Sequence, residues 1–406
     1  MADPSIVAFG RYLKIVRERR KLSLEDVAHL TKAYPEPVNK GYLSRVERGL
    51  NHVGFSKMVA LSRAYEIPLD AFGERYALDL EVDRLKSPPD TDNRTFGDLF
   101  EEGRRLANTG KRTHSFACLR DALPKAAVDP VISNYGGRSE QIAAACLSHG
   151  VAAVALGRYR LGMVEVIAAR DARSLRAEFL PIVSHELSII HRQLGDFRSA
   201  KELADQAIKE AQEAPEHRYL AEAYSVRARL AKDDQEYDKA IELYQSAFKV
   251  KKEAGRSDES ALVLLNLAAV YFEVGRIGAT RRTIQAAEKL EHLKPTSSVR
   301  PRLRILLGEV EALQGHRDKA SAHWHTAITM AKETNDRVAH FNAEFRLFKL
   351  AVESGNHAVL NSLGRRLSRM APWIPTAEPE VEQFHALYSR HRKPKQRGVA
   401  NPQHGP

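Results

Sequence analysis

The sequence predicts an all-α protein in two parts, a five-helix head followed by an α-solenoid of stacked helix pairs. Three observations predict this architecture. In the head, apolar residues recur at helical spacing. A proline-bearing break at residues 34–37 separates two short amphipathic segments there. Beyond residue 95, long helices follow one another, and from residue 195 a pattern of one turn residue followed by small and apolar residues recurs every 40 residues.

The composition narrows the class of protein. The 406 residues include 63 Lys and Arg against 52 Asp and Glu, and 43% are hydrophobic. This length predicts two or three domains, and a net charge of +11 favours a polyanionic partner. The two cysteines, Cys118 and Cys146, have no CxxC spacing and predict free thiols in a reduced compartment. Because long apolar runs and a signal-peptide pattern are absent, we expect a cytoplasmic protein with no membrane contact.

The head begins with a predicted helix over residues 5–19. Its apolar face is formed by Ile6, Phe9, Leu13 and Val16. Five cations add positive charge to this segment: Arg11, Lys14, Arg17, Arg19 and Arg20.

Two short helices follow, and their ends are marked. Ser23 and Asp26 have the spacing of a capping box, which starts the first of them. The prolines of residues 34–37 force a turn. Asn39 is a good N-cap for the second helix, and Gly49 stands where a helix stops.

The second of these helices has two different faces. Leu43, Val46 and Leu50 lie on one side at helical spacing. The other side carries Gly41, Ser44, Arg45 and Arg48, and its small and cationic residues suit close approach to a DNA groove. Arg45 on this side can form two hydrogen bonds with a guanine in the major groove.

Together these residues outline a helix-turn-helix, and residues 5–75 resemble the Xre/Cro family of such domains. The matching residues include Ser23, Val27-Ala28, Leu43 to Gly49, and Leu61 to Leu69. The resemblance implies that Lys40, Gly41, Ser44 and Arg45 occupy base-reading positions and that Arg17 forms an ion pair with Glu47. The predicted DNA-contacting set is Lys40, Gly41, Tyr42, Ser44, Arg45 and Arg48.

Two features depart from the family. Leu24 stands where the family often has a glutamine that contacts phosphate, which weakens one backbone contact. The turn is longer than usual around residues 32–37, and this length adds a contact or shifts the docking angle. A helical domain with a solvated basic face and no DNA partner stays open as the alternative.

The remaining head and the linker are predicted from local signals. A fourth helix spans residues 56–65, and a fifth follows Pro68. The polar, proline-bearing segment after residue 86 is typical of a linker. We therefore predict a DNA-binding domain at 1–80, a linker at 81–94, a repeat superhelix at 95–384 and a basic flexible tail at 385–406.

The repeats are defined by their turns. Gly195, Gln235, Gly275, Gly315 and Gly355 are spaced by 40 residues, and Gly110 and Gly157 begin looser copies. Small or aromatic residues follow each turn at helical spacing, as in Ala200, Ala204 and Ala207. Each unit is predicted to be two antiparallel helices that stack on their neighbours.

This pattern resembles the tetratricopeptide repeat family, which forms a superhelix with a concave groove. In that family, groove residues lie about nine positions before each turn residue. The groove residues implied here are Glu186, Arg229, Asn266, Asn342 and Arg346, with Arg192, Lys232, Glu309 and Lys349 nearby. Asn266 stands in an apolar run, and either a bound peptide or a partner within the helix stack would satisfy its amide.

No catalytic or metal-binding pattern is present in the sequence. His316, His323, His325 and His340 are not completed by cysteines or paired carboxylates, so we expect no metal. The stretch from Gly103 to Lys111 lacks P-loop spacing. We expect no enzymatic activity and no cofactor.

The prediction for function is a sequence-specific transcriptional regulator. The head binds double-stranded operator DNA, and the repeats sense a peptide or protein effector, a layout similar to peptide-responsive quorum-sensing regulators. A homodimer is expected, because the two DNA-binding domains of a dimer can occupy the two halves of one palindromic site. The alternative is a protein-interaction scaffold with a weak DNA tether, and a toxin–antitoxin or phage-immunity regulator is a third reading.

Overall fold

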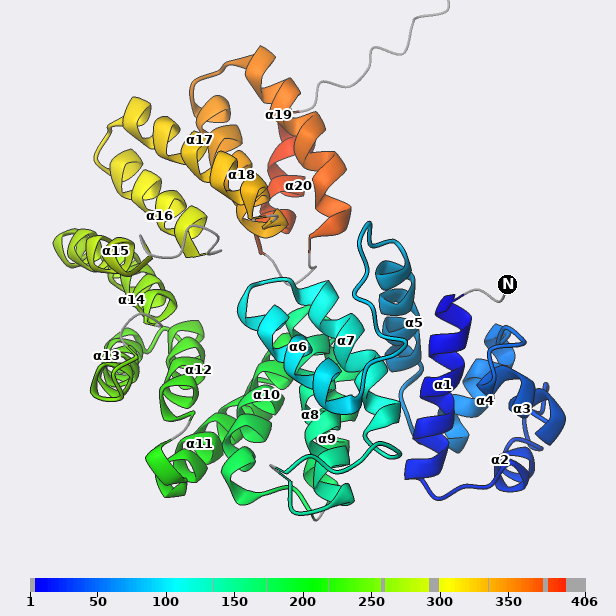
Figure 1. Cartoon of the computed structure of the whole chain (residues 1–406). Coiled ribbons are helices and arrows are strands. Elements are labelled where there is room, and N and C mark those ends of the chain that lie inside the picture. Colours follow the sequence, from blue (N-terminus) through cyan, green and yellow to red (C-terminus); the bar gives the residue numbers. More distant parts are fainter. Residues whose placement is uncertain are drawn as a thin grey trace, which may run out of the picture. The chain divides into compact units, whose positions relative to one another are not determined.

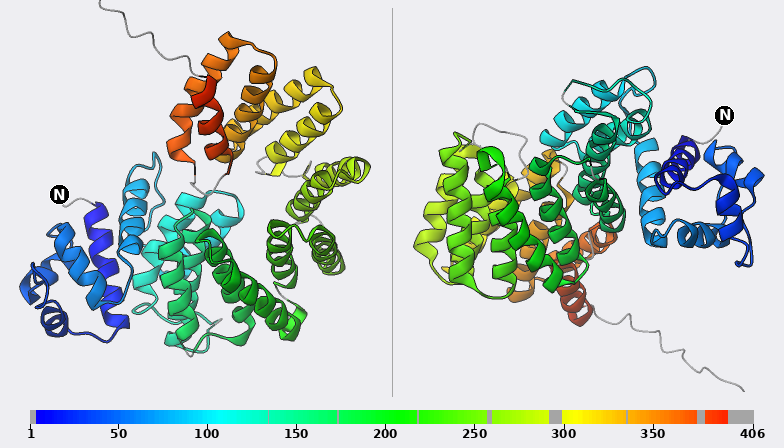
Figure 2. Two further views of the ribbon diagram at one scale, coloured as in Figure 1. Left: turned by 180° about the vertical axis from the view of Figure 1, so that it is seen from behind. Right: turned by 90° about the horizontal axis from the view of Figure 1, so that it is seen from below.

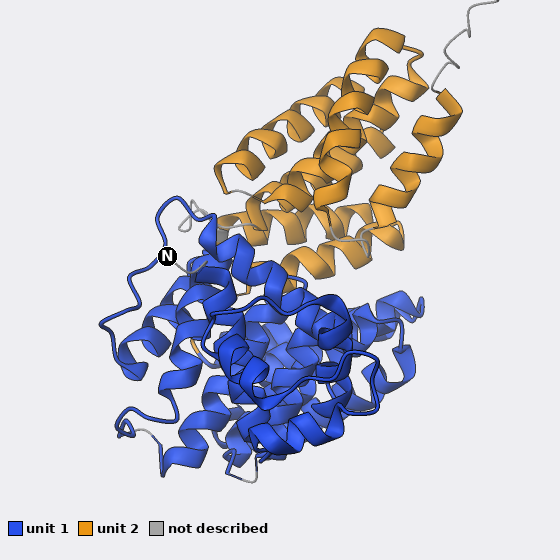
Figure 3. Cartoon of the chain, turned by 90° about the vertical axis from the view of Figure 1, so that its right-hand side faces the viewer, with its two compact units in different colours: residues 1–254 blue, residues 255–406 orange. Residues whose placement is uncertain are grey.

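The computed structural model confirms the all-α fold (Figure 1). It describes residues 4–133, 135–172, 174–217, 219–256, 260–291, 299–334, 336–374 and 379–391, and in these ranges it has helices and no strand. The chain divides into two compact units, residues 1–254 and residues 255–406 (Figure 3).

The head opens the first unit and ends its helices as the capping residues predict. Its five helices are α1 (Pro4–Arg19), α2 (Leu24–Leu30), α3 (Lys40–Glu47), α4 (Phe55–Ala64) and α5 (Leu69–Asp83). Ser23 and Asp26 form the predicted capping box, and the Asn39 side chain accepts a hydrogen bond from the Tyr42 amide. The amide of Gly49, at a φ of 70°, donates to the Val46 carbonyl and closes α3.

Antiparallel helix pairs make up the rest of the first unit (Figure 2). They are α6 (Phe96–Asn108) with α7 (Arg112–Lys125), α8 (Arg138–Ala155) with α9 (Tyr159–Asp171), α10 (Leu180–Gln193) with α11 (Phe197–Glu213), and α12 (Leu220–Asp233) with α13 (Tyr237–Glu253). Short 3-10 turns, η1 (Ala177–Phe179) and η2 (Pro215–His217), precede α10 and α12.

The second unit continues the same architecture. Its pairs are α14 (Ala261–Glu273) with α15 (Ile277–Glu291), α16 (Val299–Leu313) with α17 (Arg317–Glu333), and α18 (Arg337–Glu353) with α19 (His357–Met370). The 3-10 turn η4 (Ala371–Trp373) leads toward α20 (Pro379–His391). The ring of Phe384 on α20 is fully buried against Phe341, Phe345 and Phe348, so α20 covers the last pair.

Small residues at the periodic positions explain why the pairs pack closely. Ala200, Ala204 and Ala207 are fully buried. The equivalent positions of the next three pairs are also buried: Ala240, Tyr244 and Ala247; Thr280, Ile284 and Ala287; and Ala320, Trp324 and Ala327. Where the pattern places Trp324, the facing residue is Gly308, whose added Cβ would lie 2.4 Å from the indole nitrogen. A large side chain on one helix is therefore matched by a small residue on the helix that faces it.

Two predicted boundaries move in the structure. Helix α5 continues to Asp83, past the predicted end of the head at residue 80. Helix α20 continues to His391, so the predicted tail does not begin at residue 385. The rings of Phe384 and Tyr388 pack against Phe348 of α18 and hold this helix. The rest of the predicted tail, residues 392–406, lies outside the described residues.

The repeat turns predict a stabilising substitution at Gln235. Every other turn residue of the 40-residue series is a glycine with positive φ, whereas Gln235 adopts a φ of 63° with an exposed side chain. A left-handed conformation costs a non-glycine residue about 1–2 kcal/mol, so Gln235→Gly should raise the free energy of unfolding by about 1 kcal/mol. Thermal and urea unfolding of the full chain measure this.

A second glutamine supplies the control for this test. Gln206 is exposed inside helix α11, where glycine is unfavourable. Gln206→Gly should lower the free energy of unfolding by about 1 kcal/mol. If both variants change stability in the same direction, backbone strain at Gln235 is not the cause.

Candidate nucleic-acid interface

The outer edge of α3 faces solvent. Lys40, Gly41, Arg45 and Arg48 are exposed, and Tyr42 and Ser44 are half-buried. On the opposite side, Leu43 and Val46 are at most 1% exposed and fix the helix in the core of the head. The structure thus brings the predicted DNA-contacting residues onto one accessible edge.

The side chains on this edge differ in how much of their hydrogen-bonding capacity is free. Arg45 has no side-chain hydrogen bond or ion pair within the described part of the chain. Lys40 is paired with Glu25 of α2. Arg48 donates from Nε to the Ser44 carbonyl at 3.2 Å. The Tyr42 hydroxyl donates to the His52 carbonyl at 2.8 Å, so the ring lies against the loop that follows α3.

Arg17 and Glu47 hold the edge in place. The guanidinium donates through Nε to Glu47 Oε1 at 2.7 Å and through Nη2 to Oε2 at 2.9 Å. Its third nitrogen donates to the Leu22 carbonyl at 2.8 Å, just before α2. Both charged groups are nearly buried, with side-chain exposures of 11% and 6%. This two-point geometry ties α1, the start of α2 and α3 together.

Glycine permits the closest approach between α1 and α3, a feature that the sequence analysis missed. A Cβ added to Gly10 would lie 2.2 Å from the Val46 carbonyl oxygen. A Cβ on Gly49 would lie 2.7 Å from Val7. A glycine inside an otherwise regular amphipathic helix was the available signal, because it weakens the helix unless another backbone packs on it.

A buried side chain joins the two ends of the long turn between α2 and α3. The buried Thr31 hydroxyl donates to the Val27 carbonyl at 2.8 Å and accepts from the Val38 amide at 3.1 Å. Residues 32–37 between them are mostly exposed, and Lys57 of α4 donates to Glu36 at 2.9 Å. The extra residues therefore lie mostly at the surface, and the two ends of the turn are joined by Thr31.

A hollow of about 490 Å³ lies beside α3, between α1 and α3. Arg11 and Lys14 of α1 and Arg48 at the end of α3 line it, together with the Ser44 side of the edge. These three cations line the same hollow as Ser44, one of the predicted DNA-contacting residues.

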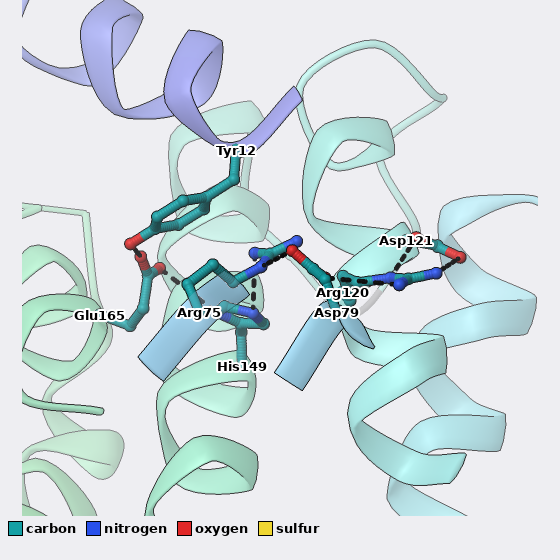
Figure 4. A network of polar contacts seen from close by, with 7 residues as sticks. All are labelled: Tyr12, Arg75, Asp79, Arg120, Asp121, His149 and Glu165. Carbon is teal, nitrogen blue, oxygen red and sulfur yellow. Dashed lines mark hydrogen bonds and ion pairs between the residues drawn. The ribbon is translucent and has the colours of Figure 1, made fainter. Parts of the chain in front are cut away.

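The head is attached to the first helix pairs through a buried polar network (Figure 4). The Tyr12 hydroxyl of α1 donates to Glu165 Oε1 of α9 at 2.9 Å. Arg19 of α1 donates to the other oxygen of the same carboxylate at 2.9 Å. His149 of α8 brings Nδ1 to 3.6 Å from this carboxylate, and the side chains of Glu165 and His149 have no solvent exposure.

The network continues from α5 into α7. Arg75 donates to Asp79 at 2.9 Å, and Arg120 of α7 lies 3.4 Å from the same carboxylate. The Arg75 guanidinium lies 4.5 Å from the centre of the Tyr12 ring and 3.4 Å from Nε2 of His149. Because Arg75 can only donate there, Nε2 of His149 accepts and Nδ1 carries the hydrogen.

The environment of this network changes two pKa values. Burial disfavours the charged form of Glu165, but the Arg19 cation and the contacts with His149 and Tyr12 outweigh it and lower its pKa to about 2. Burial, together with the Arg75 and Arg19 cations, lowers the pKa of His149 and outweighs the opposing effect of Glu165. At neutral pH the carboxylate is ionised and the imidazole is neutral.

The implied groove residues of the first unit are partly engaged within the protein. Glu186 of α10 is buried, with Oε1 3.4 Å from Nδ1 of His185. Arg229 of α12 is half-buried beside the Tyr244 hydroxyl. Arg192 of α10 pairs with Asp233 of α12 at 2.5 and 3.2 Å.

The implied groove residues of the second unit fall into two groups. Arg346 of α18 pairs with Glu309 of α16 and with Glu380 of α20, so it is occupied by neighbouring helices. Asn266 of α14 is half-buried and has no side-chain hydrogen bond among the described residues. The Asn342 carbonyl oxygen is buried there without a partner. The amides of Asn266 and Asn342 therefore have hydrogen-bonding groups to spare, whereas the guanidinium of Arg346 is engaged by two carboxylates.

The described residues offer neither a metal site nor a membrane span. They contain no group of three or more His, Cys, Asp or Glu side chains placed to hold a metal ion. Their helices include none with both the length and the apolar character needed to cross a bilayer. Cys118 and Cys146 are buried free thiols, and burial raises the pKa of each to about 11.

Comparison with known proteins gives two family matches. A model of the helix-turn-helix domain matches residues 8–72, and a model of the tetratricopeptide repeat matches residues 180–253. Among curated proteins, none matches the sequence of this chain.

Three solved structures are similar to parts of this chain. PlcR of Bacillus thuringiensis, in complex with the peptide PapR7 and DNA, is 12% identical, with 71% of this chain and 95% of that chain covered and a TM-score of 0.42. The Rap conjugation gene regulator of plasmid pLS20, in complex with a Phr peptide, is 13% identical, with coverage of 75% and 95% and a TM-score of 0.48. A tetratricopeptide protein of Thermus thermophilus is 23% identical, with coverage of 49% and 96% and a TM-score of 0.37.

The matched segments agree with the elements described above. The helix-turn-helix match covers α1 from residue 8 onward and all of α2 to α4, and the repeat match covers α10 to α13. The chain therefore joins an Xre-like helix-turn-helix domain at its N-terminus to tetratricopeptide repeats.

Proposed function

We propose that this protein is a sequence-specific DNA-binding regulator in which α3 reads bases in the major groove. The observation that carries the proposal is the exposed edge of α3, with Arg45 unpaired among the described residues and the helix braced from behind by Arg17 and Glu47. A free guanidinium on a rigid helix is suited to two-point recognition of guanine.

The surrounding charges support a duplex as the partner. Arg11, Lys14 and Arg48 lie around the hollow beside α3, and the whole chain has a net charge of +11. Contacts of this kind position a protein on the phosphate backbone without reading sequence. Base reading at Arg45 and phosphate contacts around it together make a specific site.

The repeats are proposed to bind a peptide or protein effector. Asn266 and Asn342 support this, because their amides have unused hydrogen-bonding capacity on the first helix of a pair. Peptide backbones present the N–H and C=O groups that such amides bind. A homodimer is part of the proposal, since two heads can occupy a palindromic operator about one DNA turn apart.

Substitution of Arg45 tests base reading. Arg45→Ala should reduce affinity for the preferred duplex by about 1–3 kcal/mol and relax the preference at one base position. Selection of bound duplexes from a random pool, performed with both proteins, measures the preference. Loss of a phosphate contact would instead weaken all duplexes about equally and reduce the salt dependence.

Arg63 supplies a matched control. It is an exposed arginine of α4, outside the α3 edge, so Arg63→Ala removes the same charge. The selected consensus should be unchanged in this variant. If Arg45→Ala also keeps the consensus of the unsubstituted protein, base reading by α3 is wrong, and a scaffold with a weak DNA tether becomes the better account.

A further inference from the structure

A second cavity lies where the head meets the first helix pairs. It has a volume of about 660 Å³ and is bounded by α1, by the end of α7 and by α8, with residues 91–92 at its rim. Volumes of roughly 300–1,000 Å³ are typical of sites for small organic ligands. Every wall belongs to the first unit, and the cavity is separate from the repeat groove residues described above.

Most of the wall is apolar. Ile15 of α1, Leu123 of α7 and Ile142 of α8 line it from three helices. Val128, which follows α7, is 73% exposed at the same place. An apolar ligand body would cover this exposed valine and remove it from water.

The charged groups of the wall favour an anion. Arg19 donates one nitrogen to Glu165, whereas its Nε and Nη2 are buried without a hydrogen-bond partner in the described structure. Arg11 has no ion pair among the described residues and lies with Lys14 on the same wall. Buried donors without acceptors are costly, so an acceptor on a ligand would be favourable here.

The acids of the wall are largely neutralised. Asp121 accepts from Arg120 at 2.9 and 3.1 Å and from the Thr91 hydroxyl at 2.7 Å. Glu18 lies 3.8 Å from both Lys14 and Arg17. Asp92 is exposed at the rim, where water screens its charge. Deeper in the wall, the groups without a hydrogen-bond partner in the described structure are therefore donors, the Nε and Nη2 groups of Arg19.

We propose that this cavity binds a small amphipathic organic anion, with a carboxylate or sulfonate directed to Arg19 and an apolar body against Ile15, Leu123 and Ile142. Such a ligand would contact α1 of the head and two repeat helices at once. It would stabilise the junction between them, because a ligand that binds only the assembled form stabilises that form. This site does not depend on the DNA-reading proposal.

Binding can be measured on the full chain with defined probes. The fluorescence of 1-anilinonaphthalene-8-sulfonate reports occupancy, and decanoate, decylammonium and decanol compete for the site below their micellar concentrations. Decanoate should displace the dye about tenfold more effectively than decanol, because only the carboxylate adds a charge-assisted hydrogen bond. Decanoate should also raise the melting temperature.

Two types of variant locate the site. Ala127 lines the cavity but is exposed, so Ala127→Trp should fill its mouth without disturbing the core and weaken decanoate binding by about tenfold or more. Val128→Trp is a second variant of the same design. Ala107→Trp, an exposed position of α6 that is not part of the wall, is the matched control and should bind as the unsubstituted protein does.

The arginine is tested separately. Arg19→Lys keeps a cation for Glu165 but removes the planar fork, so it should reduce the preference for decanoate over decanol while the binding of decanol stays the same. The proposal is overturned if decanoate fails to compete, or if decylammonium or decanol competes as well as decanoate. It is also overturned if folded Ala127→Trp and Val128→Trp, checked by circular dichroism, bind decanoate normally.

Discussion

Glu165→Ala is expected to lower the free energy of unfolding of the head and its junction by about 3–5 kcal/mol. The carboxylate accepts from Tyr12 and Arg19 of α1 and lies beside His149 of α8, and its side chain is fully buried. Removing it leaves a buried arginine without its counter-charge and a buried hydroxyl without its acceptor. Both losses are large because the Tyr12 hydroxyl is buried and because two of the Arg19 nitrogens, Nε and Nη2, are already buried without a partner among the described residues.

Hydrogen exchange is the measurement for this variant, because a chain with two compact units need not unfold in one step. Amides of α1 and α5 should exchange much faster in Glu165→Ala, while amides of α18 should keep their protection. Glu101 supplies the control, since its side chain is 63% exposed and, within the described part of the chain, forms an ion pair with Arg104 alone. Glu101→Ala should change protection by less than about 0.5 kcal/mol; an equal effect of the two substitutions would show that the network does not hold the head.

The same network predicts that acid loosens the head. The folded pKa of Glu165 is about 2, below its usual value of 4.5, so its contribution is present at neutral pH and is lost as pH falls from about 4.5 toward 2. The pKa of His149 is also lowered, so its contribution begins to fall as pH drops through its usual value of 6.5. Both groups act in the same direction, and in Glu165→Ala the acid-dependent loss of α1 protection should be smaller.

The elements and caps of this fold could be predicted because their causes are local. Ser23, Asn39 and Gly49 act within a few residues of themselves, and the structure uses each as predicted. The repeat turns could be predicted for a related reason, since a repeated packing problem leaves a repeated residue pattern. Boundaries that depend on tertiary packing were less accurate, as the extension of α20 by Phe384 shows.

The buried network could not be predicted from local patterns. Tyr12 and Glu165 are separated by 153 positions, and Arg75 and His149 by 74. In the sequence, each is an ordinary polar residue of an amphipathic helix, and only the stacking of the head on the first pairs brings them together. The groove residues illustrate the same limit, because the pairing of Arg346 with Glu309 and Glu380 depends on the spacing of three helices.

Substitution of Glu47 should have an effect of similar size inside the head. Glu47→Leu leaves Arg17 nearly buried and without its two-point partner, and the free energy of unfolding of the head should fall by about 3–5 kcal/mol. Arg17 also donates to the Leu22 carbonyl, so the contacts of α1 with α2 and with α3 should weaken at the same time. Exchange of the α3 amides and affinity for a selected duplex measure the two consequences.

The double variant Arg17→Met with Glu47→Leu distinguishes a structural pair from a DNA contact. Replacing both charges with apolar side chains of similar volume removes the unpaired cation, so most of the lost stability should return. If the pair acts only by positioning α3, duplex affinity should recover in parallel with stability. Recovery of stability without recovery of affinity would mean that Arg17 or Glu47 itself contacts the DNA, and a double variant as unstable as Glu47→Leu would show that the ion pair is not what joins these helices.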